Sequence, residues 1–410
     1  MTALDVLPEV ASWRASEAGT DAIYRGEGAS LSAQLRRANR TGNPVYRQRL
    51  LEAGRLYASV IKGSKRAALD FQEAMTTSDF QLLFGDILDR QILASYQQMP
   101  VQWDLIARRG RVRDFRSVKR FTLDGGEAIL DLVKEQSEYP AAALVDGSYE
   151  YAVKKYGRRI PLSWETLIND DLDAFSDIPQ RLGNAARRSE ERFATALYAS
   201  STGPNSTFFS VANSNLLEVS DVSDAGGSGF TTTALNVTAL QAAFTRLAAQ
   251  VDTDGAPIYV DAVYLVVPPA LEVVARNIIN ASEILAANGG GDGTGNDQLR
   301  VDNWMRNRVT LVVNPWLPII DTTTGNSAWY LFANPSAGRP AMEVGFLIGH
   351  EVPELFQKSP NATRVGGTLI DPLDGDFDSD SVEWKLRAVF GGTLMDSKSA
   401  LAATGTNTPA

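Results

Sequence analysis

Side chains able to do acid–base, nucleophilic or metal chemistry are scarce in this chain of 410 residues, which has one histidine and no cysteine. The absence of cysteine excludes a disulfide framework, a thiolate metal site and a cysteine nucleophile. A single histidine also excludes a metal site built on two histidines. That residue, His350, lies in EVGFLIGHEVPELF at the end of an apolar run. We interpret it as a structural residue at a strand end.

Two loop-like stretches have the composition of a ligand site but lack its spacing. GGGDGTGN at 289–296 follows a helical pattern, and its glycines do not fit G-x-G-x-x-G, so we predict a surface loop. DPLDGDFDSD at 371–380 alternates aspartates as a calcium loop does. However, Ser379 stands where an EF-hand requires Gly, and no Glu follows at the twelfth position. We interpret this stretch as a solvated acidic loop, or one that meets a basic neighbour.

Motifs of other enzyme classes are also missing, because the chain has no phosphate-binding loop and no G-x-S-x-G elbow. We therefore predict that the protein is not an enzyme, with no catalytic residues, no metal and no cofactor. No apolar run approaches the roughly 20 residues that cross a bilayer. Residues 1–28 lack the apolar core of a secretory signal. We expect no membrane segment.

Charge is divided unevenly along the chain, whose net charge is −10. Residues 1–205 hold 28 basic and 27 acidic side chains, whereas residues 206–410 hold 11 basic and 22 acidic. One interpretation is ordinary surface charge. The other is that one half of a subunit attracts the other half of a neighbouring subunit.

The first hundred residues predict an arm rather than a self-sufficient core. Residues 30–70 contain nine basic and two acidic side chains, and their apolar stripe is thin. We expect this segment to be partly helical and to lie against something else. A further helix is predicted over 77–99, because Pro100 follows its end.

Two stretches in the middle of the sequence predict a long ribbon of two strands with an elaborated tip. Residues 108–123 and 149–160 interleave apolar and charged side chains. Isolated hairpins are marginally stable in water, so such a ribbon should lean on a partner chain. The first stretch is basic, since residues 104–120 hold seven basic and two acidic side chains.

The next segment predicts a long helix with one buried face. Asp177 suits the N-cap and Pro179 the first turn. Arg187 and Glu191 are four residues apart, which predicts an ion pair on the opposite side that contributes about 0.2–0.5 kcal/mol. The apolar stripe comprises Ile178, Leu182, Ala185, Ala186, Phe193, Ala196 and Leu197.

Beyond a Ser/Thr/Gly-rich linker at 201–233, the pattern becomes that of a second compact domain with a central sheet and flanking helices. NVTALQAAFTRLAAQV predicts a helix, and VDAVYLVVPPALEVVARNIINAS predicts a strand followed at once by a helix. RVTLVVNPW, AWYLFANP and AMEVGFLIG predict further strands of this domain. Residues 382–390 predict a long strand that closes the fold.

Together these motifs identify a family resemblance. KYGRRIPLSWETLINDDLDAFSDIPQRLGNAARRSEERFATALY resembles the Mu-type branch of tailed-bacteriophage major capsid (head) proteins. In those proteins a similar pattern leads out of an extended loop into the spine helix. YLVVPPALEVVARNII is similar to the strand–Pro–helix unit of the same family's axial domain. The resemblance covers about residues 105–400.

The resemblance implies an α+β chain with the Hong Kong 97-like capsid fold. Its expected parts are an N-terminal arm at 1–108, an extended β-ribbon loop at 109–162, a peripheral domain with a long spine helix at 163–232, an axial α/β domain at 233–380 and closing strands at 381–410. The implied function is structural: pentamers and hexamers of one chain form an icosahedral shell around phage double-stranded DNA.

The same resemblance implies partners and a location. The chain would bind copies of itself, scaffolding and portal proteins, possible decoration proteins and, nonspecifically, the packaged DNA, but no membrane. It would reside in the virion capsid after assembly in the cytoplasm of the host bacterium. From the charge split we hypothesise that basic residues help the ribbon lie across acidic surface on an adjacent subunit. These residues are Arg108, Arg109, Arg111, Arg113, Arg116, Lys119 and Arg120.

Two alternatives remain open at this point. An encapsulin-like bacterial compartment protein shares the fold but encloses cargo protein, so the contents of the particle distinguish it from a phage head. A hydrolase or glycan-binding α/β protein with an attachment arm would instead be a small soluble oligomer with a polar pocket.

Overall fold

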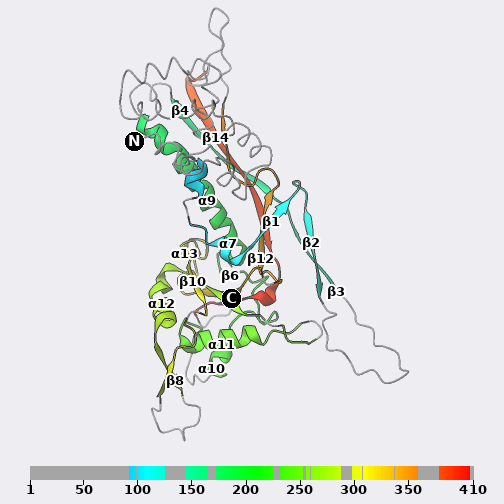
Figure 1. The fold of residues 1–410 in the computed structure, drawn as a ribbon, viewed down its shortest axis with the longest axis vertical. Helices are drawn as coiled ribbons and strands as arrows, with labels where there is room; N and C mark the ends of the chain where they lie inside the picture. Colours follow the sequence, from blue (N-terminus) through cyan, green and yellow to red (C-terminus); the bar gives the residue numbers. More distant parts are fainter. Residues whose placement is uncertain are drawn as a thin grey trace, which may run out of the picture.

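The computed structural model describes residues 92–97, 100–124, 145–163, 172–224, 231–252, 255–258, 260–287, 298–306, 308–336, 338–358 and 378–406. Two main sheets, one long helix and an outlying ribbon make up this part of the chain (Figure 1). The predicted arm at 30–70, the glycine loop at 289–296 and residues 371–377 of the acidic loop lie outside the described residues. Of the helix predicted over 77–99, residues 92–97 are described and are helical.

The larger sheet has five strands, in the order β1–β12–β14–β13, with β4 paired along the opposite edge of β14. In β14 the alternate residues from Val382 to Phe390 are buried, as expected for a half-covered strand. The long strand predicted at 382–390 is therefore confirmed. The five strands are β1 (Arg108–Val112), β4 (Lys154–Ser163), β12 (Met342–Leu347), β13 (Glu354–Gln357) and β14 (Ser381–Leu394).

The strand AMEVGFLIG was predicted for the second domain, and that prediction is wrong. It forms β12, which lies in the five-stranded sheet between β1 and β14. All six residues of β12 are buried. A strand that is buried on both faces has no alternating pattern, so its sequence does not show which sheet it joins.

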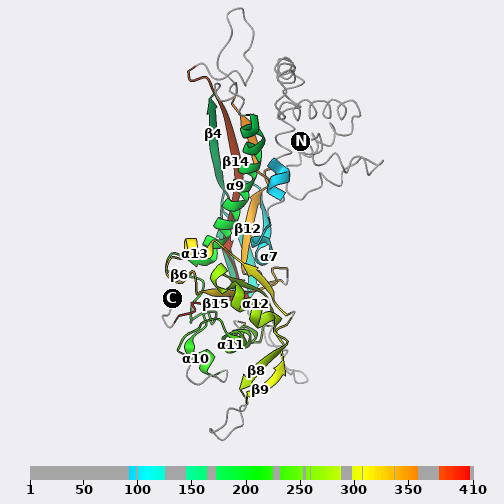
Figure 2. The same ribbon diagram turned by 90° about the vertical axis from the view of Figure 1, so that its left-hand side faces the viewer.

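The long helix α9 (Leu172–Tyr198) covers one face of this sheet and crosses β14 (Figure 2). It begins five residues before the predicted N-cap Asp177, so Pro179 lies inside the helix rather than in its first turn. Leu182 and Ala186 of the predicted stripe are buried, but Ala196 is exposed. The short helix α7 (Trp103–Ile106) and residues 92–97 pack beside α9.

The smaller sheet, of four strands in the order β10–β7–β11–β15, forms the second domain. Its helix α11 (Val237–Ala248) begins at Asn236, whose side chain accepts a hydrogen bond from the backbone N–H of Ala239. The predicted strand–Pro–helix unit is confirmed. The elements are β7 (Ala262–Val267), η1 (Pro269–Leu271), α12 (Glu272–Asn280), β10 (Thr310–Val313), α13 (Leu317–Ile320), β11 (Trp329–Ala333) and β15 (Ala400–Ala403).

The C-terminal end of α9 joins the two sheets through a shared core. The buried ring of Tyr198 packs edge-on against Tyr330 and Phe332 of β11. The same core continues to Phe390 of β14. Three two-stranded pairs and two short helices complete the described part: β2–β3, β5 (Ala199–Ser200) with β6 (Gly203–Pro204), β8 (Glu283–Ala287) with β9 (Gln298–Asp302), α10 (Val219–Asp224) and η2 (Ser397–Ser399).

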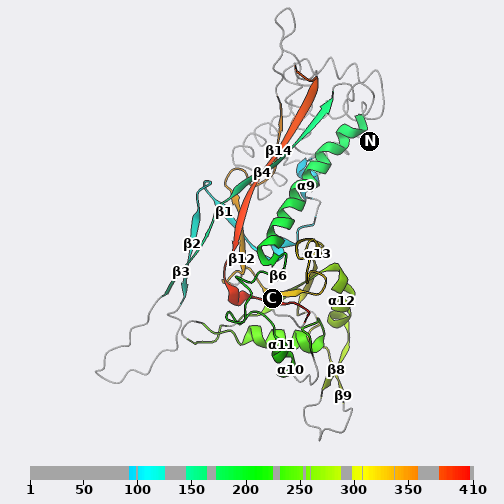
Figure 3. The ribbon, with the colours of Figure 1, turned by 180° about the vertical axis from the view of Figure 1, so that it is seen from behind.

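The ribbon consists of β2 (Val118–Asp124) and β3 (Val145–Tyr151) and projects away from the body of the molecule (Figure 3). The prediction that 108–123 and 149–160 form the two ribbon strands is wrong in part. Each stretch is divided, because β1 and β4 belong to the five-stranded sheet and only β2 and β3 form the ribbon. The predicted domain boundaries remain predictions.

Candidate interface at the base of the ribbon

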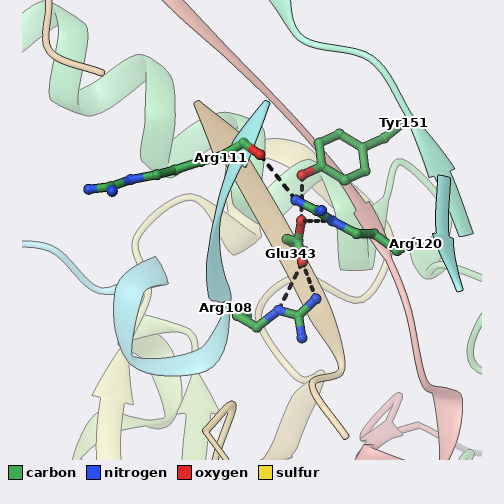
Figure 4. A network of polar contacts seen from close by, with 5 residues as sticks. All are labelled: Arg108, Arg111, Arg120, Tyr151 and Glu343. Carbon is green, nitrogen blue, oxygen red and sulfur yellow. Dashed lines mark hydrogen bonds and ion pairs between the residues drawn. The ribbon is translucent and has the colours of Figure 1, made fainter. Parts of the chain in front are cut away.

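The buried carboxylate of Glu343 anchors the ribbon to the sheet (Figure 4). The Glu343 side chain is 1% exposed. Tyr151 of β3 donates a hydrogen bond of 2.5 Å to Oε1, and Nε of Arg120 in β2 donates one of 2.8 Å to the same oxygen. From β1, Arg108 donates from Nε to Oε2 at 2.8 Å and from Nη2 to the same atom. One carboxylate thus joins β1, β2, β3 and its own strand, β12.

Electrostatics favours the charged form of this carboxylate. Burial acts to raise the pKa of Glu343, but hydrogen bonds from Tyr151, Arg108 and Arg120 outweigh it, so its pKa lies below the ordinary value of 4.5. The pKa of the Tyr151 phenol shifts in the opposite direction. Burial and the neighbouring carboxylate raise the pKa of Tyr151, which keeps its hydroxyl hydrogen in place as a donor.

Three glycines in register open the space that the ribbon occupies. Gly110 is paired with Gly345, which is paired with Gly391, so they form a row across β1, β12 and β14. A Cβ atom on Gly345 would collide with the Tyr151 ring, and one on Gly110 would collide with Glu343. A Cβ on Gly391 would meet the backbone of the chain that follows Tyr151. We name Gly110, Gly345 and Gly391 the glycine row.

The seven predicted cations divide into two groups, of which the first contacts its own subunit. Arg108 and Arg120 bind Glu343, as above. The Arg109 guanidinium lies 5.0 Å from the centroid of Phe346 and 5.6 Å from that of Trp103. Nε of Arg111 lies 3.1 Å from Glu351, and its carbonyl oxygen accepts a hydrogen bond of 3.2 Å from Arg120.

The second group comprises Arg113, Arg116 and Lys119, whose side chains are exposed and form no ion pair with any described residue. Two large apolar side chains accompany them: Phe115 is 54% exposed and Phe121 is 75% exposed. Exposed aromatic rings beside unpaired cations are features of a surface that another molecule covers.

A second buried polar network holds residues 92–97 against α9. Tyr96 donates a hydrogen bond of 2.7 Å to Glu190, and Arg187 donates one of 3.0 Å to the same carboxylate. Glu191 accepts hydrogen bonds from the backbone N–H groups of Gln102 and Trp103. Burial raises the pKa values of both glutamates.

This network corrects the predicted surface pair of Arg187 and Glu191. Both are buried, and Arg187 is paired with Glu190 instead. The reason is that α9 is covered on a second side by residues 92–97 and α7, which a single apolar stripe does not indicate.

His350 follows β12, and its Nδ1 atom shares a hydrogen bond of 2.7 Å with Glu354. Its place after the strand fits the structural role predicted for it. Among the described residues no group of three or more His, Cys, Asp or Glu side chains could hold a metal ion. None of the described helices combines the length and the apolar character needed to cross a membrane.

The sequence patterns did not predict the roles of Glu343, Tyr151 and the glycine row. One signal for the carboxylate was present, because Glu343 is the single charge in AMEVGFLIG. A lone charge in an apolar strand indicates a buried partner of opposite sign. The partners themselves lie 192 to 235 positions away, so no local pattern identifies them.

A sequence model of the family described as phage capsid protein matches residues 148–403. This range contains the end of β3, with Tyr151, and all of β4, α9, β12 and β14, and therefore most of the framework that positions the ribbon. The chain belongs to the phage capsid protein family. No curated protein matches the sequence.

Solved structures of similar shape were also found, at low identity. A chain in a solved structure from Microbacterium phage Oxtober96 is 11% identical with a TM-score of 0.42, and the match covers 72% of this chain and 85% of that one. The capsid of cyanophage P-SCSP1u is 12% identical with a TM-score of 0.44, covering 74% and 87%. The SrpI encapsulin of Synechococcus elongatus is 9% identical with a TM-score of 0.44, covering 76% and 90%.

Family membership gives the capsid protein its role, which is to form the shell of a phage head. The expected α+β fold is confirmed, and the ribbon, the long helix and the α/β domain are the parts that the resemblance to Hong Kong 97-like capsid proteins implies. The family is structural, and its members are located in the virion capsid and assemble with copies of themselves.

Proposed function

We propose that this capsid protein assembles, in the cytoplasm of a host bacterium, into rings of five and six copies that close an icosahedral head around double-stranded DNA. The observation that supports this most directly is the ribbon. It leaves the body of the subunit as only two strands and carries Phe121 at 75% exposure. Two-stranded ribbons are marginal alone, so a second copy is needed to cover it.

The contacts at the ribbon base reduce the proposed intersubunit interface to three of the seven basic residues. Arg108, Arg109, Arg111 and Arg120 orient the ribbon through contacts within their own subunit. Arg113, Arg116 and Lys119 then face acidic surface on the adjacent subunit, with Phe115 and Phe121 as the apolar part of the contact. Head-to-tail contacts of this kind generate rings when the rotation closes.

Other partners follow from the proposed role rather than from a site in this chain. A shell of one protein needs a scaffold to set its size and a portal through which DNA enters, and decoration proteins would bind the outer surface. Contact with the packaged DNA would be nonspecific and sensitive to salt.

The test is to express the chain with and without a candidate scaffold from the same genome and to image the product by negative-stain electron microscopy. Closed shells, or rings of five and six, support the proposal, and DNA in shells from infected cells distinguishes a head from a compartment for cargo protein. A small species of uniform size under every salt and scaffold condition contradicts it.

A further inference from the structure

We infer that the exposed side of α9 binds the phosphate backbone of the enclosed DNA through a line of three arginines. These are Arg181, Arg188 and Arg192, which we name the arginine line. All three side chains are exposed, although α9 packs along the five-stranded sheet (Figure 2). The inference rests on the proposed function and deepens it, because it identifies the surface of the subunit that meets the DNA.

Helical periodicity places the three arginines on one side of α9. Arg188 follows Arg181 by seven residues and Arg192 follows Arg188 by four, so at about 100° per residue they fall within about 40° of one another around the axis. A rise of about 1.5 Å per residue spreads them over about 16 Å. Side chains of the core, such as Ala186 and Leu197, lie on the opposite side of the helix.

No carboxylate of the described part of α9 neutralises the arginine line. Glu190 and Glu191 are buried, and they accept hydrogen bonds from Tyr96, from Arg187 and from backbone N–H groups. Neither Arg188 nor Arg192 forms an ion pair with any residue that the structure describes. Like charges four residues apart on a helix repel each other, so an anion from outside the subunit would stabilise this arrangement.

The side chains beside the arginine line are small, so a bulky partner can approach the guanidinium groups closely. Ser189 and Ala196 are exposed, and Asn184 and Ala185 are partly exposed. Along the described part of α9 no large apolar side chain is exposed. Protein partners bind through aromatic and apolar anchors, whereas DNA is held at its phosphates by Arg and Lys. The composition of this surface therefore favours DNA over a protein partner.

The length of the arginine line also suits a duplex. Double-stranded DNA carries one negative charge per about 1.7 Å of its axis, so a line of about 16 Å faces several phosphates whichever way the duplex runs. Guanidinium groups present several N–H donors in a planar fork that matches a phosphate. Contacts of this kind hold the backbone without reading bases, as a shell that encloses DNA of any sequence requires.

The face of the sheet opposite α9 is less suited to DNA. Leu386 is buried with residues of α9, so its neighbour Lys385 points to the other face. On that face the carboxylates of Glu354 and Glu383 already pair with cations. The Lys385 ammonium lies 5.0 Å from the centroid of Phe356, so an aromatic ring also belongs to that surface. DNA therefore meets the α9 side of the subunit.

The first test measures DNA binding by the unassembled full-length chain. Fluorescence anisotropy with a short labelled duplex of arbitrary sequence is recorded across a salt series for the natural chain and for Arg188→Gln with Arg192→Gln. We expect the affinity to fall about tenfold and the slope of log K against log salt to become shallower by about 2.

The matched control is Arg300→Gln with Arg306→Gln, which removes the same charge from two exposed positions outside α9. It should change the affinity by less than about twofold, because salt screens charges that do not touch the DNA. Basic residues elsewhere, including those at 30–70, are the same in both variants. Equal losses in the two variants would mean that only net charge matters and would overturn the inference.

The second test locates the DNA in filled heads from infected cells. The photoreactive analogue p-benzoylphenylalanine replaces Ser189, beside the arginine line, in one chain and Lys385, on the opposite face, in another. Each is supplied together with the natural chain, so that heads form. After irradiation we expect roughly tenfold more protein–DNA product from position 189 than from position 385, since coupling needs direct contact. Equal yields overturn the inference.

The outcomes separate this inference from the proposed function. DNA-filled heads that give no DNA product from position 189 overturn the inference and leave the proposed function standing. Products that join position 189 to a protein and not to DNA identify a protein partner and also overturn it. A natural chain that forms neither rings nor shells contradicts both proposals. Glutamine is a good helix former, so circular dichroism should show an unchanged fold in the binding variants, and the crosslinking test does not depend on them.

Discussion

The phenol of Tyr151 donates its hydrogen to the carboxylate of Glu343, 192 residues away, at 2.5 Å. This bond connects the last residue of the ribbon strand β3 to β12, which pairs with β14 in the five-stranded sheet. Because Arg108 and Arg120 bind the same carboxylate, the direction in which the ribbon leaves the body depends on one anion.

Replacing Glu343 with Gln should lower the free energy of unfolding by about 2 kcal/mol, because two guanidinium groups lose their anion while the amide stays buried. The partial exposure of both arginines keeps the value below that of a fully buried pair. Chemical denaturation of the unassembled chain measures it. The matched control is Glu283→Gln, in an exposed pair with Arg300, which should change stability by less than about 0.5 kcal/mol. Equal effects of the two substitutions would contradict the proposal that Glu343 anchors the ribbon to the sheet.

Acid should weaken the same anchor. The pKa of Glu343 is lower in the folded chain than its ordinary value of 4.5, so its contribution to stability is present above that value and is lost as pH falls through the folded pKa. Limited proteolysis of the ribbon between pH 6 and pH 3 should show faster cleavage below pH 4.5, the ordinary pKa of a glutamate side chain. Glu190 and Glu191 have raised pKa values and act in the opposite sense, so the informative quantity is the difference between the natural chain and Glu343→Gln. Identical pH profiles for the two would refute the assignment.

Gly345→Ala should destabilise the chain by about 1–3 kcal/mol, because the added Cβ overlaps the Tyr151 ring. Shortening that ring to Ala in the same chain should relieve the overlap. A double-mutant cycle of Gly345→Ala with Tyr151→Ala, measured by chemical denaturation, should therefore give a coupling energy of about 1 kcal/mol or more. Additive effects would mean that the glycine is needed for another reason.

The buried network on α9 should be more sensitive to the loss of one partner than of all three. Glu190→Ala removes the carboxylate that accepts from Tyr96 and Arg187 and should cost about 3 kcal/mol. Replacing all three, as Tyr96→Phe with Arg187→Met and Glu190→Leu, should come within about 1 kcal/mol of the natural chain, since apolar side chains of similar size often replace a buried polar network without loss. Thermal unfolding of the unassembled chain compares the two variants. A triple variant as unstable as the single one would contradict this account.

Reversing Arg113, Arg116 and Lys119 to Glu should leave the fold intact and weaken assembly about tenfold or more, because these exposed cations have no ion-pair partner among the described residues. Sedimentation of assembly reactions across a salt series measures the effect. A comparable change at Arg300, which is 77% exposed on β9, serves as the control. Shells that form normally and keep their salt sensitivity would refute the interface hypothesis.

Local patterns in the sequence predicted several elements well. The helical pattern of NVTALQAAFTRLAAQV, the prolines after β7 and the alternation in β14 each depend on neighbours within a few residues. For the same reason, the strand–Pro–helix unit and the closing strand were predicted correctly.

Long-range pairing accounts for what the sequence did not predict. β12 is buried on both faces, so its sequence has no alternating pattern that shows which sheet it joins. The helix α9 begins upstream of Pro179, although a proline is typical of the first turn of a helix. The Glu343 network joins residues from both halves of the chain. The sequence pattern led to the prediction of one interface made of seven basic residues. Four of them contact groups of their own subunit, which are distant in the sequence and come close only in the folded chain.

The strands β14 and β15 follow all the other described strands in the sequence, which affects when the two sheets become complete during synthesis. β14 joins β4, β12 and β13, and β15 pairs with β11, so neither sheet is complete before residues 381–403 have been made. Pairing of this kind is slow, because distant strands must meet before any hydrogen bond forms. A nascent chain in which residues 381–403 have not yet been made therefore has neither sheet complete. Truncated products of interrupted translation would be left out of the growing shell by the same dependence.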